Sequence, residues 1–257
     1  MKILKNLYAY RELLKTSVKK DVRGKYKKST LGVIWSFLNP LLQIAVYAFV
    51  FGVILGAEEE NYAVFICCGL IPWTFFSAAI NRTAFTMIEN GNILKKVYFP
   101  REILPISVVT AEAVNFVISS IIILCFVIFS GIGFSWTWIF YPLLLVVMYI
   151  FLIAVSFFVS SITVYFRDLQ HFIGVFLQLL FYATPIAYST ERVPASFSWV
   201  VKLNPVAYII EGFRDIFIYH SIPDLLSLSV VLLGSLLLAV IGYFVFDKLQ
   251  KGFAEEL

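Results

Sequence analysis

The sequence predicts an all-α integral membrane protein with six transmembrane helices, on three observations. Hydrophobic residues make up 61 % of the 257 residues and charged residues only 14 %, whereas soluble domains are about 45–50 % apolar and about 25 % charged. Six apolar runs of roughly membrane-spanning length recur along the chain. The polar segments between these runs are too short to form a separate soluble domain.

The cations give the expected spans a direction. The spans are expected at residues 31–56, 62–81, 104–130, 137–164, 172–190 and 225–246. In this arrangement 17 of the 20 Lys and Arg residues lie on one side, and Arg192, Lys202 and Arg214 lie on the other. Lys and Arg favour cytoplasmic segments. We therefore expect a multi-pass topology with both termini in the cytoplasm.

The first thirty residues form a basic, amphipathic segment. One helical stripe over residues 3–20 carries the apolar side chains Ile3, Leu7, Tyr10, Leu14 and Val18. Such a helix before a span is expected to lie in the cytoplasmic headgroup layer. It either anchors the chain there or also meets an anionic, lipid-linked substrate. We therefore divide the chain into an interface segment, residues 1–30, and a membrane domain, residues 31–257.

The loop between the second and third spans, residues 82–102, contains a short amphipathic helix. This helix is expected to end at Phe99, because the residue before a proline is disfavoured in a helix. We expect Ile93, Leu94 and Val97 on one side of it, with Lys95 and Lys96 on the others. Water contact with an apolar ridge is unfavourable, so a partner protein is expected to cover the ridge. The alternative is an ordinary solvated loop.

Residues 191–224, between the fifth and sixth spans, do not read as a further span. Crossing takes about 20 apolar residues, and the apolar stretch 206–219 is interrupted by Glu211, Arg214 and Asp215. Glu211 and Arg214 can pair on one helix face. We expect two short helices that dip into the outer leaflet and return. Interfacial packing alone is the alternative.

Glu112 and Asn115 lie inside the third span. Carboxylates within membrane helices are rare and face protein or water. Glu112 is therefore either a functional residue or a protonated or hydrogen-bonded packing residue.

Four strings occur in order along the chain: KY-x-x-S-x-LG-x-x-W followed by NP (residues 25–40), GLIPW (69–73), FP-R-E-x-L-P (99–105) and YFRD (165–168). Together they resemble the type-2 ABC exporter permeases, and within them the branch that moves lipid-linked polysaccharides such as O-antigen and teichoic acid. The later NP and FRD strings, at 204–205 and 213–215, also look like those of the family. The resemblance implies a permease of the bacterial inner membrane and leaves open which polymer moves.

The resemblance also implies roles for three groups of residues. The coupling helix that docks in an ATPase subunit, with a second contact after the fourth span, would use Asn92, Ile93, Leu94, Lys95, Lys96, Val97, Arg101, Glu102, Arg167 and Asp168. The outer gate would use Asn204, Pro205, Glu211, Arg214 and Asp215. The substrate path would use Arg23, Lys25, Glu112 and the aromatic residues Trp35, Phe37, Tyr47, Trp73, Phe76, Tyr182 and Tyr188. Flat rings can stack on sugars, although aromatic residues in spans often face lipid or form interfacial belts.

The sequence lacks the motifs of several function classes. It has no GxxxxGK[ST] phosphate loop, no series of titratable residues for a proton relay, no H-E-x-x-H, no nucleophile elbow and no nucleic-acid-binding pattern. We expect a transport subunit that is not itself an enzyme and holds no metal or cofactor. The expected partners are a separate ATPase subunit that binds ATP and Mg²⁺, a second copy of the chain, a polyprenyl-linked glycan and membrane lipid. The alternatives are an ABC-2 exporter of a drug or small lipid, and an ATP-independent lipid-carrier flippase or membrane enzyme.

Overall fold

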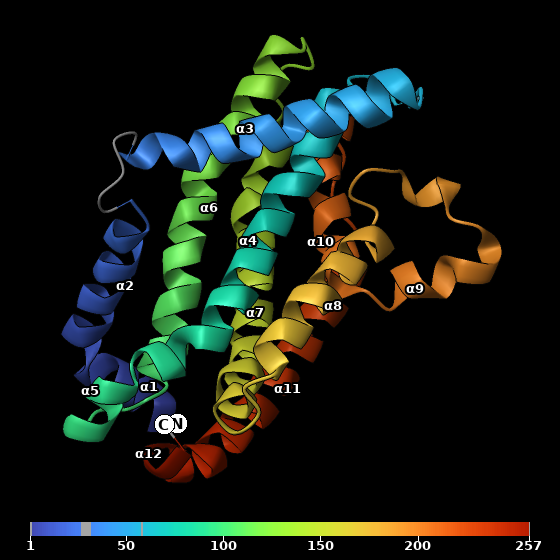
Figure 1. Cartoon of the computed structure of the whole chain (residues 1–257). Helices are drawn as coiled ribbons and strands as arrows, with labels where there is room; N and C mark the ends of the chain where they lie inside the picture. The colour runs from blue at the N-terminus through green and yellow to red at the C-terminus, as the bar shows by residue number, and fades with distance from the viewer. Residues whose placement is uncertain (1, 27–31, 58, 257) are drawn as a thin grey trace.

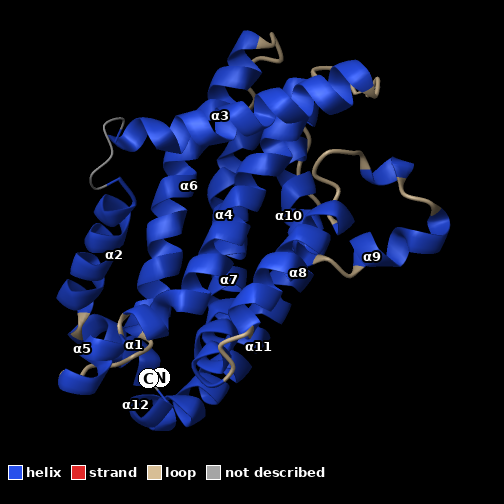
Figure 2. Ribbon diagram, in the orientation of Figure 1, coloured by secondary structure: helices blue, strands red, loops and turns tan. Residues whose placement is uncertain are grey.

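The computed structural model describes residues 2–26, 32–57 and 59–256, and this part of the chain consists of helices and loops without a strand (Figures 1 and 2). The α-helices are α1 (Lys2–Ala9), α2 (Arg11–Tyr26), α3 (Trp35–Tyr47), α4 (Tyr62–Glu89), α5 (Gly91–Lys96), α6 (Ile103–Phe129), α7 (Tyr141–Tyr165), α8 (Leu169–Ala183), α9 (Ser198–Lys202), α10 (Pro205–Arg214), α11 (Leu225–Leu249) and α12 (Phe253–Glu256). The all-α prediction is confirmed for the described residues.

Five of the helical segments are long and apolar enough to cross a membrane: Trp35–Ile54, Tyr62–Glu89, Ile103–Phe129, Trp136–Tyr165 and Leu225–Gly252. Five of the six predicted spans correspond to them, and the chain is a multi-pass membrane protein. The first predicted span begins at residue 31, and the predicted domain boundary falls at residues 30 and 31. These positions lie outside the described residues.

The predicted fifth span is shorter than expected. Its helix, α8, has 15 residues, or about 22 Å at 1.5 Å per residue, whereas a bilayer's hydrocarbon core is about 30 Å thick. The helix ends because Thr184 takes an extended conformation, with ψ 134°. Thr184 precedes Pro185, and a residue before proline is pushed out of the helical region.

The second span is longer than predicted. Helix α4 continues to Glu89 instead of ending at residue 81, so the loop begins near residue 90 and Arg82 lies on the helix. Residues 82–89 contain no Gly or Pro, and Thr83, Ala84 and Met87 are buried there. The helix therefore continues beyond its strongly apolar stretch because these side chains pack against the rest of the protein.

Helix α4 lies at the centre of the bundle and packs against α6, α7, α8 and α10. Helix α11 packs along α7 on the outside. Figure 1 shows α3 and its continuation, the π-helical Ala48–Ile54, crossing the bundle near one end instead of running alongside α4 and α6. Both chain ends lie at the opposite end, near α1, α5 and α12, which we call the terminal end.

The contact between α7 and α11 depends on Gly242. A Cβ atom there would lie 2.8 Å from the Phe158 ring and 3.0 Å from the Ala154 carbonyl oxygen, whereas a Cβ at Gly234 on the same helix would meet nothing within 4 Å. We expect Gly242→Ala to lower the free energy of unfolding by about 1–3 kcal/mol through overpacking. Gly234→Ala, the matched control, should be neutral or stabilising. Thermal unfolding of both variants in detergent tests this, and equal melting temperatures would contradict it.

A second core lies at the terminal end. Its buried members, the terminal-end cluster, are Met87, Leu94, Phe99, Leu104, Ile106, Phe157, Val164, Phe246 and Phe253. Ile3, Leu7, Tyr10 and Leu14, from the amphipathic stripe predicted for residues 3–20, pack against this cluster. These apolar side chains therefore contact the protein's own core, and the expected location of the helix in the headgroup layer stays a prediction.

Candidate functional site

The loop between α4 and α6 exposes a mixed apolar and basic surface at the terminal end. The side chains of Ile93 and Val97 are 48 % and 56 % exposed, and Tyr98 is 95 % exposed. Asn92, Lys95 and Lys96 are also exposed. Nothing in the described chain covers this surface, which we call the loop face.

The predicted apolar ridge is divided by the structure. Leu94 is only 5 % exposed and belongs to the terminal-end cluster, so it does not project from the loop with Ile93. Consecutive residues on a helix lie about 100° apart, and the α5 helix therefore turns Leu94 inward and Ile93 outward. Val97 already has an extended backbone, with ψ 130°, and follows the end of the helix. Tyr98, which the sequence analysis did not select, replaces Leu94 on the exposed surface.

Arg101 and Glu102 bind the two ends of the chain. Glu102 is buried, and its carboxylate accepts a hydrogen bond from the Asn6 amide at 2.8 Å. Arg101 donates to the Gln250 carbonyl oxygen, and its guanidinium lies 5.7 Å from the centre of the Phe253 ring. The sequence analysis gave both residues to a partner contact. In the structure their charged groups form contacts with other residues of the same chain.

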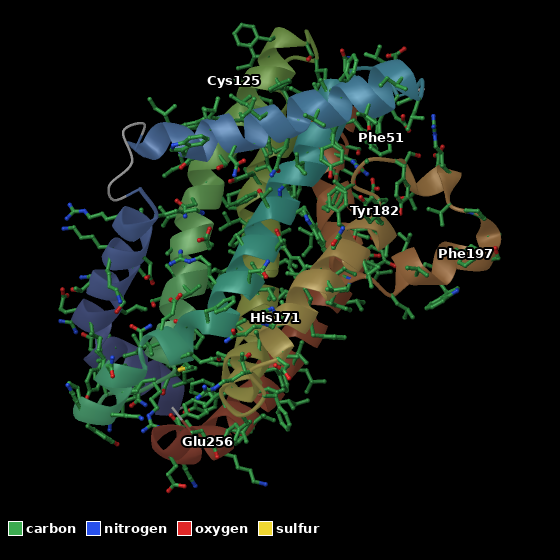
Figure 3. All side chains as sticks on the ribbon, in the orientation of Figure 1. Phe51, Cys125, His171, Tyr182, Phe197 and Glu256 are labelled. Carbon is green, nitrogen blue, oxygen red and sulfur yellow. The ribbon has the colours of Figure 1, made fainter. Side chains whose placement is uncertain are left out.

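Arg167 and Asp168, between α7 and α8, are exposed at the terminal end. Arg167 donates to the carbonyl oxygen of Glu256 at 3.2 Å, and Glu256 lies at that end of the molecule (Figure 3). The predicted second contact surface is therefore open to a partner, next to the C-terminal helix α12.

Glu112 is the centre of a charged network between α2, α4 and α6. Its carboxylate is 2 % exposed and pairs with Lys25 at 2.9 Å and with Arg82 at 2.8 Å. Arg82 also lies 3.6 Å from Asp21 on α2. Burial raises the pKa of the Asp21 carboxyl, although the charge of Arg82 opposes that shift. Glu112 is thus a packed and paired residue, as one of the two sequence interpretations expected, and its functional role stays a prediction.

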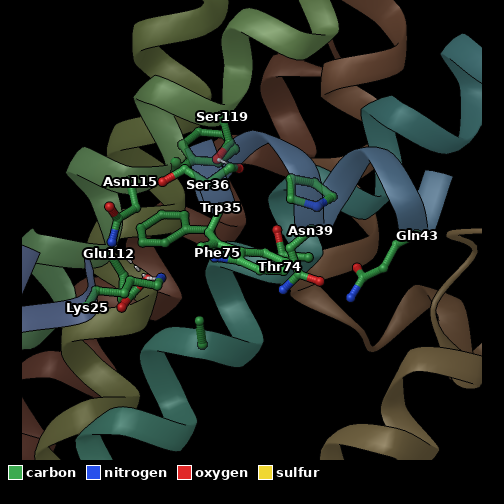
Figure 4. Close-up of a pocket in the computed structure, with 13 residues that line it drawn as sticks. Lys25, Trp35, Ser36, Asn39, Gln43, Thr74, Phe75, Glu112, Asn115 and Ser119 are labelled. Atoms are coloured by element: carbon green, nitrogen blue, oxygen red, sulfur yellow. Dashed lines mark hydrogen bonds and ion pairs between the residues drawn. The ribbon is translucent and has the colours of Figure 1, made fainter. Parts of the chain in front are cut away.

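A pocket of about 250 Å³ opens beside this network, between α3, α4 and α6 (Figure 4). Its polar lining comes from Lys25, Ser36, Asn39, Gln43, Thr74, Glu112, Asn115 and Ser119, and its rings from Trp35, Phe75 and Phe116. The pocket brings together three residues that the sequence analysis assigned to the substrate path: Lys25, Trp35 and Glu112. Arg23, which the sequence analysis also assigned to the substrate path, is exposed on α2 and does not line the pocket.

The other aromatic candidates differ in how far they are buried. Trp73 and Phe76 are 6 % and 4 % exposed and belong to the core, so neither ring is open to a passing molecule in this conformation. Phe37 and Tyr47 are partly buried against the same core. Tyr182 is 63 % exposed on α8 (Figure 3), and its carbonyl oxygen accepts a hydrogen bond from the Tyr188 hydroxyl.

In the segment between α8 and α11, Arg214 is fully buried. Its guanidinium pairs with Glu211 at 2.8 Å, donates to the Ile186 carbonyl oxygen at 2.8 Å, and lies 3.6 Å from the centre of the Phe65 ring. The Glu–Arg pair expected from the sequence is therefore present. Gly69 makes room for it, since a Cβ there would lie 3.2 Å from an Arg214 guanidinium nitrogen.

The remaining predicted gate residues begin and end α10. The Asn204 side chain accepts a hydrogen bond from the Val206 backbone N–H and donates to the Thr184 hydroxyl, with Pro205 as the first helical residue. An asparagine before a proline at the first helical position is a favoured helix start. Asp215 follows the helix, and burial, together with the nearby Glu211 charge, raises the pKa of its carboxyl to about 6.

The structure also identifies site residues that the sequence analysis missed. Asp21 and Arg82 join the charged network, and Asn39 and Gln43 line the pocket. The four-residue spacing of Trp35, Asn39 and Gln43 was a usable signal, because it places them on one helix face. Within the described ranges, no group of three or more His, Cys, Asp and Glu residues is arranged to hold a metal ion.

Comparisons with known proteins place the chain in a family. Residues 12–218 match the family described as ABC-2 type transporter. The whole chain is 35 % identical to 99 % of a Klebsiella pneumoniae protein named O-antigen export system permease protein RfbA, and 32 % identical to all of its Myxococcus xanthus namesake. Over 87 % of its length it is 24 % identical to 88 % of the Escherichia coli polysialic acid transport protein KpsM. The resemblance seen in the sequence strings is thereby confirmed, and the chain belongs to the ABC-2 type transporter family.

Proposed function

We propose that this chain is the permease subunit of an ATP-driven exporter that moves a lipid-linked polysaccharide, of the O-antigen kind, across the bacterial inner membrane. The observation that carries the proposal is full-length similarity, at 32–35 % identity, to proteins named as O-antigen export permeases. The more distant relative is also named for transport of a polysaccharide. Family membership implies a separate ABC ATPase subunit, which would bind ATP and Mg²⁺.

The proposed topology has six crossings, with the terminal end in the cytoplasm. Helix α3, which lies across the bundle in this conformation, would be one of them after turning to run alongside α4 and α6. Helix α1 and the basic loop after α4 lie at that end, and the basic helix α2 runs from it alongside α6 (Figure 1). Positive charges favour the cytoplasmic side. Helix α8 would be the sixth crossing element. Because α8 reaches only about 22 Å, residues 184–224 would dip into the outer leaflet to meet its end. That arrangement supports the proposal that α9 and α10 form an outer gate.

The loop face is the proposed docking site for the ATPase. It joins α4 directly to α6, so movement of a docked partner would tilt both helices. Ile93, Val97 and Tyr98 supply apolar contacts, and Lys95 and Lys96 supply charges at the rim. The exposed Arg167 and Asp168 would form the second contact.

We expect the double variant Ile93→Asp, Val97→Asp to release the ATPase and abolish glycan export. Both side chains are about half exposed, so the change places charges in the docking contact without entering the terminal-end cluster. Leu94→Asp is a poorer test, since the buried Leu94 would damage the fold as well. Export is measured as glycan at the cell surface, and docking as co-purification of the ATPase.

Two control variants sharpen this test. Lys95→Ala should have a milder, salt-sensitive effect, because rim charges act more on association rate than on affinity. Leu4→Asp, on α1, changes another exposed apolar residue at the same end and should retain the ATPase. An Ile93→Asp, Val97→Asp protein that still held its ATPase and exported glycan would exclude the loop face as the docking site.

A second copy of the chain is the proposed partner within the membrane. In the most apolar windows of the segments 35–54 and 225–252, only 11 % and 17 % of residues are buried. These surfaces need lipid or protein around them, and a dimer would place a transport path between the two copies.

A further inference from the structure

Helix α3 carries a polar stripe that its location in an apolar segment does not explain. Asn39 and Gln43 follow Trp35 at intervals of four residues, which places all three on one face of the helix. The segment 35–54 has a mean hydropathy of 1.9 and is a candidate span. Amide side chains left unpaired in a membrane are costly, so this face requires water or a polar ligand.

A second polar stripe faces it across the pocket. Glu112, Asn115 and Ser119 project from α6 at intervals of three and four residues, and α4 adds Thr74. Figure 4 shows Glu112, Lys25 and Asn115 together at one end of the pocket and Gln43 at the other. Hydrogen-bonding groups therefore occur along the whole length of the pocket.

Several of these groups have hydrogen-bonding capacity left. Within residues 32–57 and the other described ranges, the side chains of Asn39 and Gln43 form no hydrogen bond. The Thr74 hydroxyl donates to the Ile71 carbonyl of its own helix at 2.8 Å, so its oxygen can still accept. Two amides and a hydroxyl can thus both donate to and accept from one ligand.

The charge of the pocket argues against an anionic ligand. Among the described residues of its lining, the cation is Lys25, and its ammonium is already paired with the Glu112 carboxylate at 2.9 Å. A phosphate would have to displace that carboxylate or lie beside it. An uncharged ligand rich in hydroxyl groups meets no such penalty.

The walls of the pocket suit a ring with one apolar face. Trp35 lines the pocket and is 44 % exposed overall, and Phe75, also in the lining, stacks on Phe116 with ring centres 5.1 Å apart. The volume of about 250 Å³ is below the range of about 300–1,000 Å³ that is typical for drug-sized ligands. A single six-membered sugar ring has the required combination of C–H faces and equatorial hydroxyls.

We propose that this pocket binds one uncharged sugar residue of the glycan, with Asn39 and Gln43 as the residues that recognise its hydroxyls. The inference rests on the proposed function and adds a location and a ligand class to it. Such a site would favour glycans whose repeat contains a neutral sugar.

The test places a short diazirine-bearing side chain at Asn39, Gln43 or Leu42 of the full-length chain, in cells that also make the ATPase. Leu42 is the matched control, because it adjoins Gln43 on α3, is 55 % exposed and does not line the pocket. After irradiation, glycan adducts should appear at Asn39 and Gln43 but not at Leu42. They should disappear in cells that cannot synthesise the glycan. Equal adducts at Leu42, or adducts to lipid headgroups without glycan, would overturn the proposal.

A second measurement covers the case in which a substitution damages folding. The double variant Asn39→Leu, Gln43→Met removes two hydrogen-bonding groups with little change in volume. Export at limiting glycan should fall about tenfold, whereas Leu42→Ala should not change it. Unchanged export by the double variant would refute the sugar site. Failure of the proposed function would look different, because surface glycan would then survive deletion of the whole chain.

Discussion

Arg214→Met should cost about 3 kcal/mol in the free energy of unfolding, the low end of the range for breaking a buried ion pair. The guanidinium is fully buried, and its loss leaves the Ile186 carbonyl oxygen without its donor and Glu211 without its counter-charge. We place the effect at the low end because Glu211 is 33 % exposed and can be partly hydrated. The measurement is thermal unfolding in detergent, combined with proteolysis of residues 184–224.

Three further variants separate charge from geometry at this position. Arg214→Lys should be intermediate, because one ammonium cannot reproduce the guanidinium's fixed fork of donors. Adding Glu211→Gln to Arg214→Met should recover part of the loss by removing the unpaired carboxylate. Arg192→Gln breaks an ion pair with Glu59 in which Arg192 is 43 % exposed, and should have a much smaller effect. If Arg214→Met lowered the free energy of unfolding no more than Arg192→Gln, the buried ion pair would not be what stabilises residues 184–224.

Glu112→Gln should loosen α2 from the bundle and strongly reduce export. The carboxylate is the common partner of Lys25 and Arg82, and the neutral amide leaves both cations without it. Hydrogen bonds to charged groups are worth about 1.5–3 kcal/mol each, and the partial exposure of both cations lowers the loss to about 2 kcal/mol. Amide hydrogen exchange over residues 11–26 should become faster, because α2 has lost its main polar attachment to α6.

The matched control for this variant lies on α2 itself. Glu12→Gln removes the exposed pair with Lys15, which solvent screens, and should leave exchange in α2 unchanged. A Glu112→Gln protein with unchanged protection over residues 11–26 and normal export would show that the network is dispensable. Normal export with faster exchange would separate transport from the attachment of α2.

The positions of the long helices could be predicted from the sequence because the length of an apolar run is a local property. The direction of a helix in the bundle is not local. Helix α3 has the composition of a span but crosses the other helices in the structure (Figure 1). The early end of α8 was also readable in principle, since Pro185 was visible in the sequence. The apolar residues before and after it made the run look continuous.

The candidate site was predictable where two residues are close in the sequence. Glu211 and Arg214 are three residues apart on one helix, and they pair as expected. The contacts of Arg101 and Glu102 within the chain could not be predicted, because their partners, Gln250 and Asn6, are distant in the sequence. The side of α5 that carries Leu94 was likewise decided by the terminal-end cluster, to which the C-terminal Phe253 belongs.

The attachments of Arg101 and Glu102 have a consequence for the order in which the protein is made. Glu102 can bind Asn6 as soon as both have emerged from the ribosome, but Arg101 must wait for Gln250, which lies 149 residues later. At about 5–20 residues per second of synthesis, that delay is roughly 7–30 s. Phe253, which completes the cluster beneath Leu94, arrives at the same late stage. A nascent or C-terminally truncated chain therefore has an unfinished loop face, and a partner that recognises the finished face selects for completed chains.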